Sequence, residues 1–251
     1  MTRYFCITCE IFARPIYLSA AYSPHVIDIQ LIERGLHNSP DKLRSRIQQH
    51  IDQVEGRGYD GILLAYGLCG NSTNGLQARS IPLIIPRIHD CITFLLGSRQ
   101  RYEIEFENNP GTYWYTQDFI ERQSDSGGFD SMGLVADNDI SKMYADYVNK
   151  YGEENAQYLM EVMGSWQSHY QRAAFIDTGL GNNRDRETEV SKDAQKRGWL
   201  FETLPGDLVL FHQLLNGEWD DKDFIVISPN NSLTISYDKN IFRGCYCEQQ
   251  E

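Results

Sequence analysis

Two stretches of the chain are apolar almost without interruption, and they restrict the fold more than any other feature. They are "YDGILLAYG" (59–67) and "IPLIIP" (81–86). A strand exposed on one face alternates apolar and polar residues, whereas a continuous apolar run is typical of a parallel strand covered on both faces. A short strand, "RYFCITC" (3–9), and a helix over 39–58 precede these runs. The apolar face of that helix consists of Leu43, Ile47, Ile51 and Val54. Strand, helix and strand in this order form a right-handed crossover unit, so we expect an α/β fold with a parallel-sheet, three-layer, Rossmann-like architecture.

The last third of the chain repeats the alternation of strands and helices. A strand over 173–179 ends in Asp177, and a polar helix near 187–198 follows it. Asp207 is expected to cap the helix "LVLFHQLLN", and residues 223–229 form a final apolar strand. This repetition predicts two related α/β halves.

The middle of the chain separates these halves. Residues 100–136 are aromatic, Gly-rich and irregular, which favours a lid or an insertion. A helical segment is expected over about 139–171. We therefore expect an N-terminal half, 1–136, which carries the Cys and His residues, and a second half, 137–251, or else one continuous domain.

Charge and composition exclude several classes of protein. The 251 residues carry 35 acidic and 23 basic side chains, a net charge of -12, which argues against nucleic acid and against an anionic membrane surface. The first twenty residues lack a signal-peptide apolar run, and no stretch reaches the roughly 20 apolar residues of a membrane span. We expect a cytoplasmic protein whose six cysteines are reduced, and whose thiols serve packing, metal binding or catalysis.

Three cysteines follow the predicted strands. Cys9 ends the first strand, Cys69 follows the run at 59–67, and Cys91 follows the run at 81–86. Parallel strands bring their carboxyl ends to one edge, with neighbouring strands about 5 Å apart. The three thiols are therefore expected to converge, although free cysteines also often serve only for packing.

Thiolates and imidazole together suit zinc. Cys9, Cys69 and Cys91, or two of them with His89, provide the three protein ligands of a catalytic zinc site. His89 and Cys91 are two residues apart and point to the same side of an extended segment. An iron–sulfur cluster on the three cysteines is the alternative, and the spacings match no standard motif of either kind.

Further residues are candidates for catalysis and for anion binding. Asp90 is placed to orient His89 or to accept a proton, and Glu10 is a second candidate acid or base beside Cys9. The glycine turns "GLCGN" and "DTGLGNN" either cradle an anion or are simple turns; the candidate residues there are Gly70, Asn71, Asp177 and Gly179.

The remaining cysteines are less informative. Cys6 points to the opposite face of its strand from Cys9 and is expected in the core. Cys245 and Cys247 are expected to be peripheral.

Long blocks of the sequence resemble one family. "GLHNSPDKLR", "YDGILLAYGLCGN", "PRIHDCITFLLGSRQRY", "PGTYWYT", "DTGLGNNR" and "LPGDLVLFHQLLNGEWDDKDFIVISP", with "CE" at 9–10, are similar to the signature blocks of the DUF1638 family. The family pattern falls here on Cys9, Cys69, His89, Asp90 and Cys91. Members occur in bacteria and methanogenic archaea, and many lie beside genes of corrinoid-dependent methyltransferases. The resemblance therefore implies methyl transfer or one-carbon metabolism, with corrinoid or methyltransferase proteins as partners.

Three functions are consistent with these features. The first is a zinc–thiolate enzyme acting on a small molecule, with methyl transfer as the reaction implied by the resemblance. The second is an iron–sulfur protein for sulfur or redox chemistry. The third is a non-catalytic accessory protein that carries a metal or cofactor to corrinoid methyltransferases.

Overall fold

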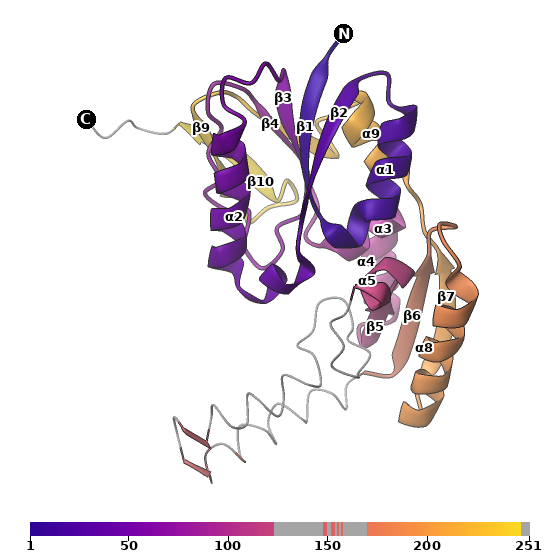
Figure 1. Cartoon of the computed structure of the whole chain (residues 1–251). Helices are drawn as coiled ribbons and strands as arrows, with labels where there is room; N and C mark the ends of the chain where they lie inside the picture. The colour runs from indigo at the N-terminus through magenta and orange to yellow at the C-terminus, as the bar shows by residue number, and fades with distance from the viewer. Residues whose placement is uncertain (123–147, 150–151, 154, 156, 158–169, 247–251) are drawn as a thin grey trace. The chain divides into compact units, whose positions relative to one another are not determined.

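The chain folds into two compact units. The computed structural model describes residues 1–122, 148–149, 152–153, 155, 157 and 170–246. Unit 1 comprises Met1–Arg99 and Asp207–Glu251, and unit 2 comprises Gln100–Gly206. The predicted boundary between residues 136 and 137 lies outside the described residues, as does nearly all of the helix predicted over 139–171. Each unit is an α/β structure with a parallel sheet (Figure 1).

The sheet of unit 1 has five strands in the order β2-β1-β3-β4-β8. The strands from β1 to β4 pair in parallel, which confirms the predicted parallel sheet, whereas β8 pairs antiparallel with β4. A two-stranded antiparallel sheet, β9 with β10, completes the unit. The strands are β1 (Arg3–Cys9), β2 (Val26–Ile32), β3 (Gly61–Ala65), β4 (Leu83–Pro86), β8 (Phe224–Ile227), β9 (Asn231–Ile235) and β10 (Phe242–Tyr246).

Helices cover both faces of the unit 1 sheet. On one face, Leu43, Ile47 and Ile51 of α2 pack with apolar residues of β1, β3 and β4, as the periodicity predicts. On the other face lie α1 and α9 (Figure 1), where the rings of Phe94 and Phe211 stack with centroids 3.9 Å apart. The helical elements of the unit are η1 (Glu10–Phe12), α1 (Ala13–Tyr22), η2 (Arg34–Asn38), α2 (Pro40–Gln53), α3 (Cys91–Leu96) and α9 (Val209–Asn216).

Unit 2 has a parallel sheet in the order β5-β6-β7. Its strands are β5 (Thr112–Tyr115), β6 (Arg172–Asp177) and β7 (Leu200–Pro205), and its helices are α4 (Arg99–Asn108), α5 (Gln117–Glu121) and α8 (Asn183–Arg197). The expectation that 100–136 is irregular is wrong for its first part. Tyr113 and Tyr115 are buried core residues of β5, not residues of a loop. The rest of the stretch, from residue 123 on, lies outside the described residues.

Candidate functional site

Three cysteines lie at the carboxyl ends of three neighbouring strands of unit 1. Cys9 is the last residue of β1, Cys69 lies four residues beyond the end of β3, and Cys91 is the first residue of α3, which follows β4. Each is partly accessible to solvent. We call these three residues the thiol edge.

The segments that carry Cys69 and Cys91 are bound side by side. The Leu68 backbone N–H donates to the Ile88 carbonyl at 3.0 Å, and the Cys69 N–H donates to the His89 carbonyl at 2.9 Å. Gly67 allows this approach because a Cβ there would lie 2.9 Å from backbone atoms of Ile88, His89 and Asp90. The apolar runs of β3 and β4 thus continue as two paired segments up to the thiols.

The backbone around Cys69 is unusual. Cys69, Gly70 and Asn71 have φ values of 44°, 63° and 71°, and the first and last of these are not glycines. Non-glycine residues in the left-handed region cost free energy and are retained where surrounding contacts hold them. One such contact runs from Arg44 Nη2 of α2 to the Asn71 carbonyl at 2.8 Å.

The thiols share one electrostatic environment. Burial is the largest cause that raises the pKa of Cys69, to about 12, and the charges of Asp90 and Cys9 raise it further, against a backbone hydrogen bond at Gly67 that lowers it. The pKa of Cys91 is raised well above its usual value by burial, then by Asp90, Cys69 and Cys9. Without a cation, these two thiols are therefore protonated at neutral pH.

Asp90 and Glu10, the two candidate catalytic acids or bases, each accept a hydrogen bond from the backbone near the thiols. The Asp90 carboxylate caps α3, since its Oδ1 accepts from the Thr93 N–H and the Thr93 hydroxyl, both at 3.0 Å. Glu10 Oε1 accepts from the Arg34 backbone N–H at 2.8 Å and so ties the end of β1 to η2.

The predicted imidazole belongs to His89, whose backbone is paired with that of Cys69. His89 is exposed, and its described contact with the thiol edge is made by its carbonyl group, not by its ring. A second imidazole, His37 of η2, lies near Asp90. Its pKa is lowered by burial and by Arg34, and raised by Asp90, although the residue as a whole keeps an exposed surface.

Sequence reasoning also missed Tyr66, the residue directly after β3. Only 3% of it is exposed, and its hydroxyl has no hydrogen-bond partner among the described residues. Burial raises its pKa well above 10.0, and Cys9, Cys69, Cys6 and Glu10 raise it further. Within an apolar run the ring resembles a core residue. The signal available in the sequence was a phenolic oxygen at the carboxyl end of a predicted parallel strand, which is where open parallel sheets generally bind ligands.

The described side chains do not form a ready metal-binding group. In the described ranges, no three His, Cys, Asp or Glu residues are grouped so that they could hold one metal ion. The sulfur donors themselves are of the type that soft cations such as zinc prefer. The zinc site therefore stays a prediction.

The four residues predicted to bind an anion lie in two different units of the structure. Gly70 and Asn71 lie in the turn at Cys69, in unit 1, whereas Asp177 and Gly179 follow β6 in unit 2. The Asp177 carboxylate accepts from the Gly179 N–H at 2.8 Å and from the Asn183 side-chain amide. Asp177 thus organises its own turn.

Two of the remaining cysteines are described. Cys6 is a fully buried core residue, as expected, and burial raises its pKa to about 12. Cys245 lies in β10 and is partly buried. Cys247 lies outside the described residues.

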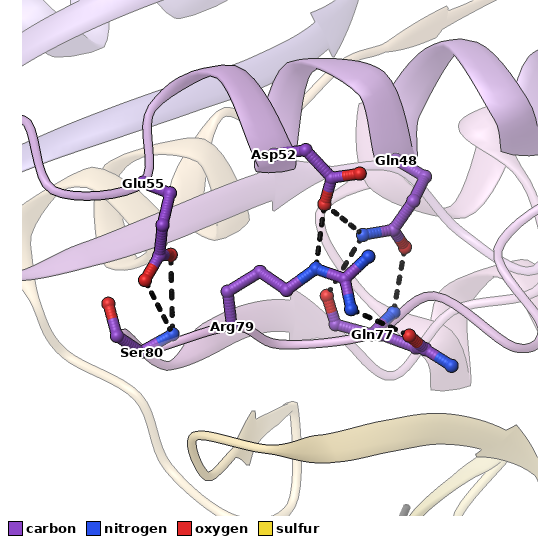
Figure 2. A network of polar contacts seen from close by, with 6 residues as sticks. All are labelled: Gln48, Asp52, Glu55, Gln77, Arg79 and Ser80. Atoms are coloured by element: carbon purple, nitrogen blue, oxygen red, sulfur yellow. Dashed lines mark hydrogen bonds and ion pairs between the residues drawn. The ribbon is translucent and has the colours of Figure 1, made fainter. Parts of the chain in front are cut away.

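A polar groove of about 790 Å³ runs along α2. Figure 2 shows the polar network that borders it: Asp52 Oδ1 accepts from Arg79 Nε at 2.7 Å and from Gln48 Nε2 at 2.9 Å, and Gln48 Oε1 accepts from the Gln77 N–H at 2.9 Å. Because these groups bond one another, they fasten the connection between the Cys69 turn and β4 onto α2. The groove is lined by Arg44, Ser45, Gln48, Gln49, Asp52, Gln53, Gly75 and Gln77.

These features define an α/β protein with thiols at the carboxyl edge of a parallel sheet. The chain belongs to the family described as "Protein of unknown function (DUF1638)", which matches residues 31–215. The match includes Cys69 and the "HDC" sequence at 89–91, whereas Cys9 and Glu10 precede it. No curated protein and no solved structure matches the chain. No helix in the described part of the chain is long and apolar enough to cross a membrane.

Proposed function

We propose that the thiol edge binds a zinc ion and that the protein is an enzyme that acts on a small molecule there. The observation that carries the proposal is the position of Cys9, Cys69 and Cys91. They follow three adjacent strands, and Cys9 and Cys69 both contribute to the raised pKa of Cys91.

The strand order supports a ligand site at this edge. We infer that the unit 1 sheet is doubly wound and Rossmann-like, because α1 and α2, which follow β1 and β2 in the chain, lie on opposite faces. In such sheets the chain order reverses between two neighbouring strands, and ligands bind beyond their carboxyl ends. In the order β2-β1-β3-β4-β8 that point falls between β1 and β3, next to Cys9 and Cys69.

The backbone at Cys69 supports a functional role for its thiol. A glycine would adopt its φ of 44° without steric cost, yet a cysteine occupies the position. Strained positions of this kind cluster at active and ligand-binding sites.

The protonated thiols are compatible with zinc binding. A divalent cation exchanges with thiol protons and stabilises the thiolates, which reverses the effect of burial on their pKa. Bound zinc lowers the pKa of a thiol or water that reaches it. A substrate thiol deprotonated in this way is a nucleophile for a methyl group, which is the reaction class implied by the resemblance.

Elemental analysis of anaerobically purified protein tests the proposal. Wild type is measured beside Cys69→Ser and beside Cys245→Ser, which removes a thiol in β10 as a matched control. We expect about one zinc per chain in wild type and in the control. Cys69→Ser should lose it.

Two other results are informative. Iron with sulfide in place of zinc would favour the iron–sulfur function. Absence of metal from all three proteins would refute a metal site and leave the thiols to packing or nucleophilic catalysis.

A further inference from the structure

Strand β2 lies at one edge of the unit 1 sheet (Figure 1). In the described part of the chain it pairs with β1 alone, in parallel and over all seven of its residues. The Val26 N–H donates to the Thr2 carbonyl at 3.0 Å, so the even-numbered residues of β2 direct their backbone groups toward β1. Because this direction alternates along a strand, the N–H and C=O groups of Ile27, Ile29 and Leu31 point outward from the sheet.

The outward edge of β2 is not protected in the ways that edge strands usually are. Its sequence, "VIDIQLI", contains neither proline nor lysine, and its register with β1 runs without a bulge. Among the outward groups, a described partner exists for the Leu31 carbonyl, which accepts from the Gln30 side-chain amide at 2.8 Å. Within the described residues, β2 is therefore an edge that another strand can join.

The sequence of β2 is complementary to itself in the antiparallel direction. A two-fold axis through Ile29 places this residue opposite its own copy. Ile27 then lies opposite Leu31, and these outward-pointing residues form hydrogen-bonded pairs across the axis. At the strand ends, Val26 lies opposite Ile32. Apolar side chains thus face apolar side chains in each of these pairs.

The remaining pair joins Asp28 to Gln30. Their backbone groups point toward β1, so they form a non-hydrogen-bonded pair, in which opposed side chains are closest. Asp28 Oδ2 accepts from Arg3 and Tyr59 within the protomer, whereas no partner of Oδ1 is described. Gln30 Nε2 carries two hydrogens and uses one for the Leu31 carbonyl, so the other is available to Asp28 of a second copy.

Shifted registers are less favourable. An axis through Asp28 would place two carboxylates directly opposite each other, which is destabilising. An axis through Gln30 would place Asp28 opposite the apolar Ile32. Only the axis through Ile29 pairs every residue of β2 with another residue of the strand.

Apolar surface next to this edge adds to the argument. Tyr17 and Tyr22 of α1 are 54% and 76% exposed, and Val26 of β2 is 37% exposed. The helix α1 packs on β2, on the face opposite α2 (Figure 1). A two-fold axis perpendicular to the sheet keeps both copies of α1 on the same face. Apolar area beside the edge is thereby available for burial between the copies.

We propose that the protein forms a two-fold symmetric dimer through β2. The two five-stranded sheets join antiparallel into one continuous sheet, with the axis at Ile29. The interaction surface is the outward edge of β2, and the partner is a second copy of this chain. This proposal is independent of the proposed function, because it involves neither the thiols nor a metal.

The test uses opposite charges at position 30 in the full-length protein. Sedimentation equilibrium, in the presence of a phosphine reductant, measures the dimer dissociation constants of wild type, Gln30→Glu and Gln30→Lys. In the dimer, glutamate opposes a second carboxylate to Asp28, whereas lysine opposes a cation to it. Gln49→Glu is the control, because it adds the same charge as Gln30→Glu at an exposed position of α2. Circular dichroism verifies that each variant has the wild-type fold.

We expect wild type and Gln49→Glu to dimerise with equal dissociation constants. Gln30→Glu should raise the constant by about 2–30-fold, because the pair with Asp28 occurs twice across the axis. Gln30→Lys should lower it by a similar factor. Opposite effects of the two substitutions are specific to a register in which residue 30 meets Asp28.

Three results would overturn the proposal. A wild-type protein that stays monomeric up to its solubility limit would exclude the dimer. A dimer with the same dissociation constant in wild type and in both position-30 variants would place the interface outside β2. Equal weakening by Gln30→Glu and Gln30→Lys would show that residue 30 meets its own copy, which excludes an axis at Ile29.

Discussion

At the scale of single residues, the thiol edge depends on two backbone positions next to Cys69. Gly67 lies against the backbone of residues 88–90 so closely that no side chain fits. Cys69 itself adopts a left-handed conformation. The first position brings the segments after β3 and β4 together, and the second determines the direction in which the thiol points.

Gly67→Ala should destabilise the protein. The added Cβ would lie 2.9 Å from three backbone atoms, which cannot rotate away as a side chain does. We expect a loss of about 1–3 kcal/mol in the free energy of unfolding, measured by urea denaturation. Gly35→Ala is the control, because a Cβ on Gly35 would have no described atom within 4 Å and should change stability little. Equal stabilities of the two variants would contradict the close packing at Gly67.

Cys69→Gly and Cys69→Ala separate the strain at this position from the loss of the thiol. Both lack the sulfur, but only glycine adopts a φ of 44° without steric cost. We expect Cys69→Gly to exceed Cys69→Ala in the free energy of unfolding by about 1 kcal/mol, measured in metal-free protein. A more stable alanine variant would show that the turn is not strained.

At the scale of elements, a buried guanidinium connects three elements of unit 2. Arg172 of β6 is 4% exposed, and it bonds Glu105 of α4 at 2.8 Å and Glu202 of β7 at 2.6 Å. It therefore links a helix and two strands. Removal of Arg172 leaves the largely buried Glu105 carboxylate, 20% exposed, without its partner, whereas the Glu202 side chain is 54% exposed and stays solvated.

Arg172→Met should therefore destabilise the protein strongly. We expect a loss of about 3 kcal/mol in the free energy of unfolding by urea denaturation. Arg186→Met is the control, because the pair of Arg186 with Glu189 on α8 is exposed and is expected to contribute about 0.3–0.5 kcal/mol. Similar losses in the two variants would show that Arg172 contributes no more than a surface charge.

Asp28 should make the free energy of unfolding depend on pH under acidic conditions. It lies where β1, β2 and the segment before β3 meet. Asp28 of β2 accepts from the Tyr59 hydroxyl at 2.8 Å and pairs with Arg3 at 2.6 Å. Tyr59 first, and then Arg3, lower the Asp28 pKa below its ordinary value of 3.8. A carboxylate with a lowered folded-state pKa stabilises the protein above the unfolded-state pKa, and this contribution is lost as the pH falls through the folded-state value.

Asp28→Asn tests this dependence. The difference in unfolding free energy between wild type and the variant should be constant near neutral pH and should narrow as the pH falls below 3.8. Urea denaturation at a series of pH values measures it. A difference that does not change with pH would mean that Asp28 has the same pKa in the folded and unfolded states.

Sequence patterns located some helices and strands of unit 1 correctly and left other features of the unit unpredicted. The apolar runs located β3 and β4, and the spacing of Leu43, Ile47 and Ile51 located α2, because burial alone sets those patterns. The antiparallel direction of β8 was not predictable, since an apolar run reads the same in either direction. Tyr66 and His37 were missed because their proximity to the thiols and to Asp90 arises from tertiary structure.

At the scale of the whole molecule, unit 2 is an insertion into unit 1. The chain leaves unit 1 at Arg99 and returns at Asp207. Its exit and re-entry are adjacent within unit 1: the Asp207 N–H donates to the Leu95 carbonyl at 2.9 Å, and a Cβ on Gly97 would lie 2.6 Å from the Asp207 Cβ. A short connection can therefore replace the inserted residues.

Unit 1 should fold without unit 2. Replacement of residues 100–206 by a short Gly/Ser linker is expected to leave one cooperative thermal transition, followed by circular dichroism, because the sheet and its helices are complete within unit 1. The same deletion with Gly97→Ala is the control, and it should fold poorly because Asp207 occupies the space. A deletion protein without a cooperative transition would show that unit 1 depends on unit 2.

The split of unit 1 along the chain has a consequence for protein synthesis on the ribosome. Strands β1 to β4 are translated first, all of unit 2 follows, and α9, β8, β9 and β10 are made last. During this interval β4 has an unpaired edge and Phe94 lacks the ring of Phe211. Exposed edges and apolar surfaces of nascent chains are sites of aggregation, for which cells provide chaperones. The N-terminal sheet is therefore exposed to aggregation until translation is nearly complete. The segment after Cys69 gains its backbone hydrogen bonds to β9, from Gly75 to Leu233 and from Ala78 to Asn231, only after unit 2 has been made.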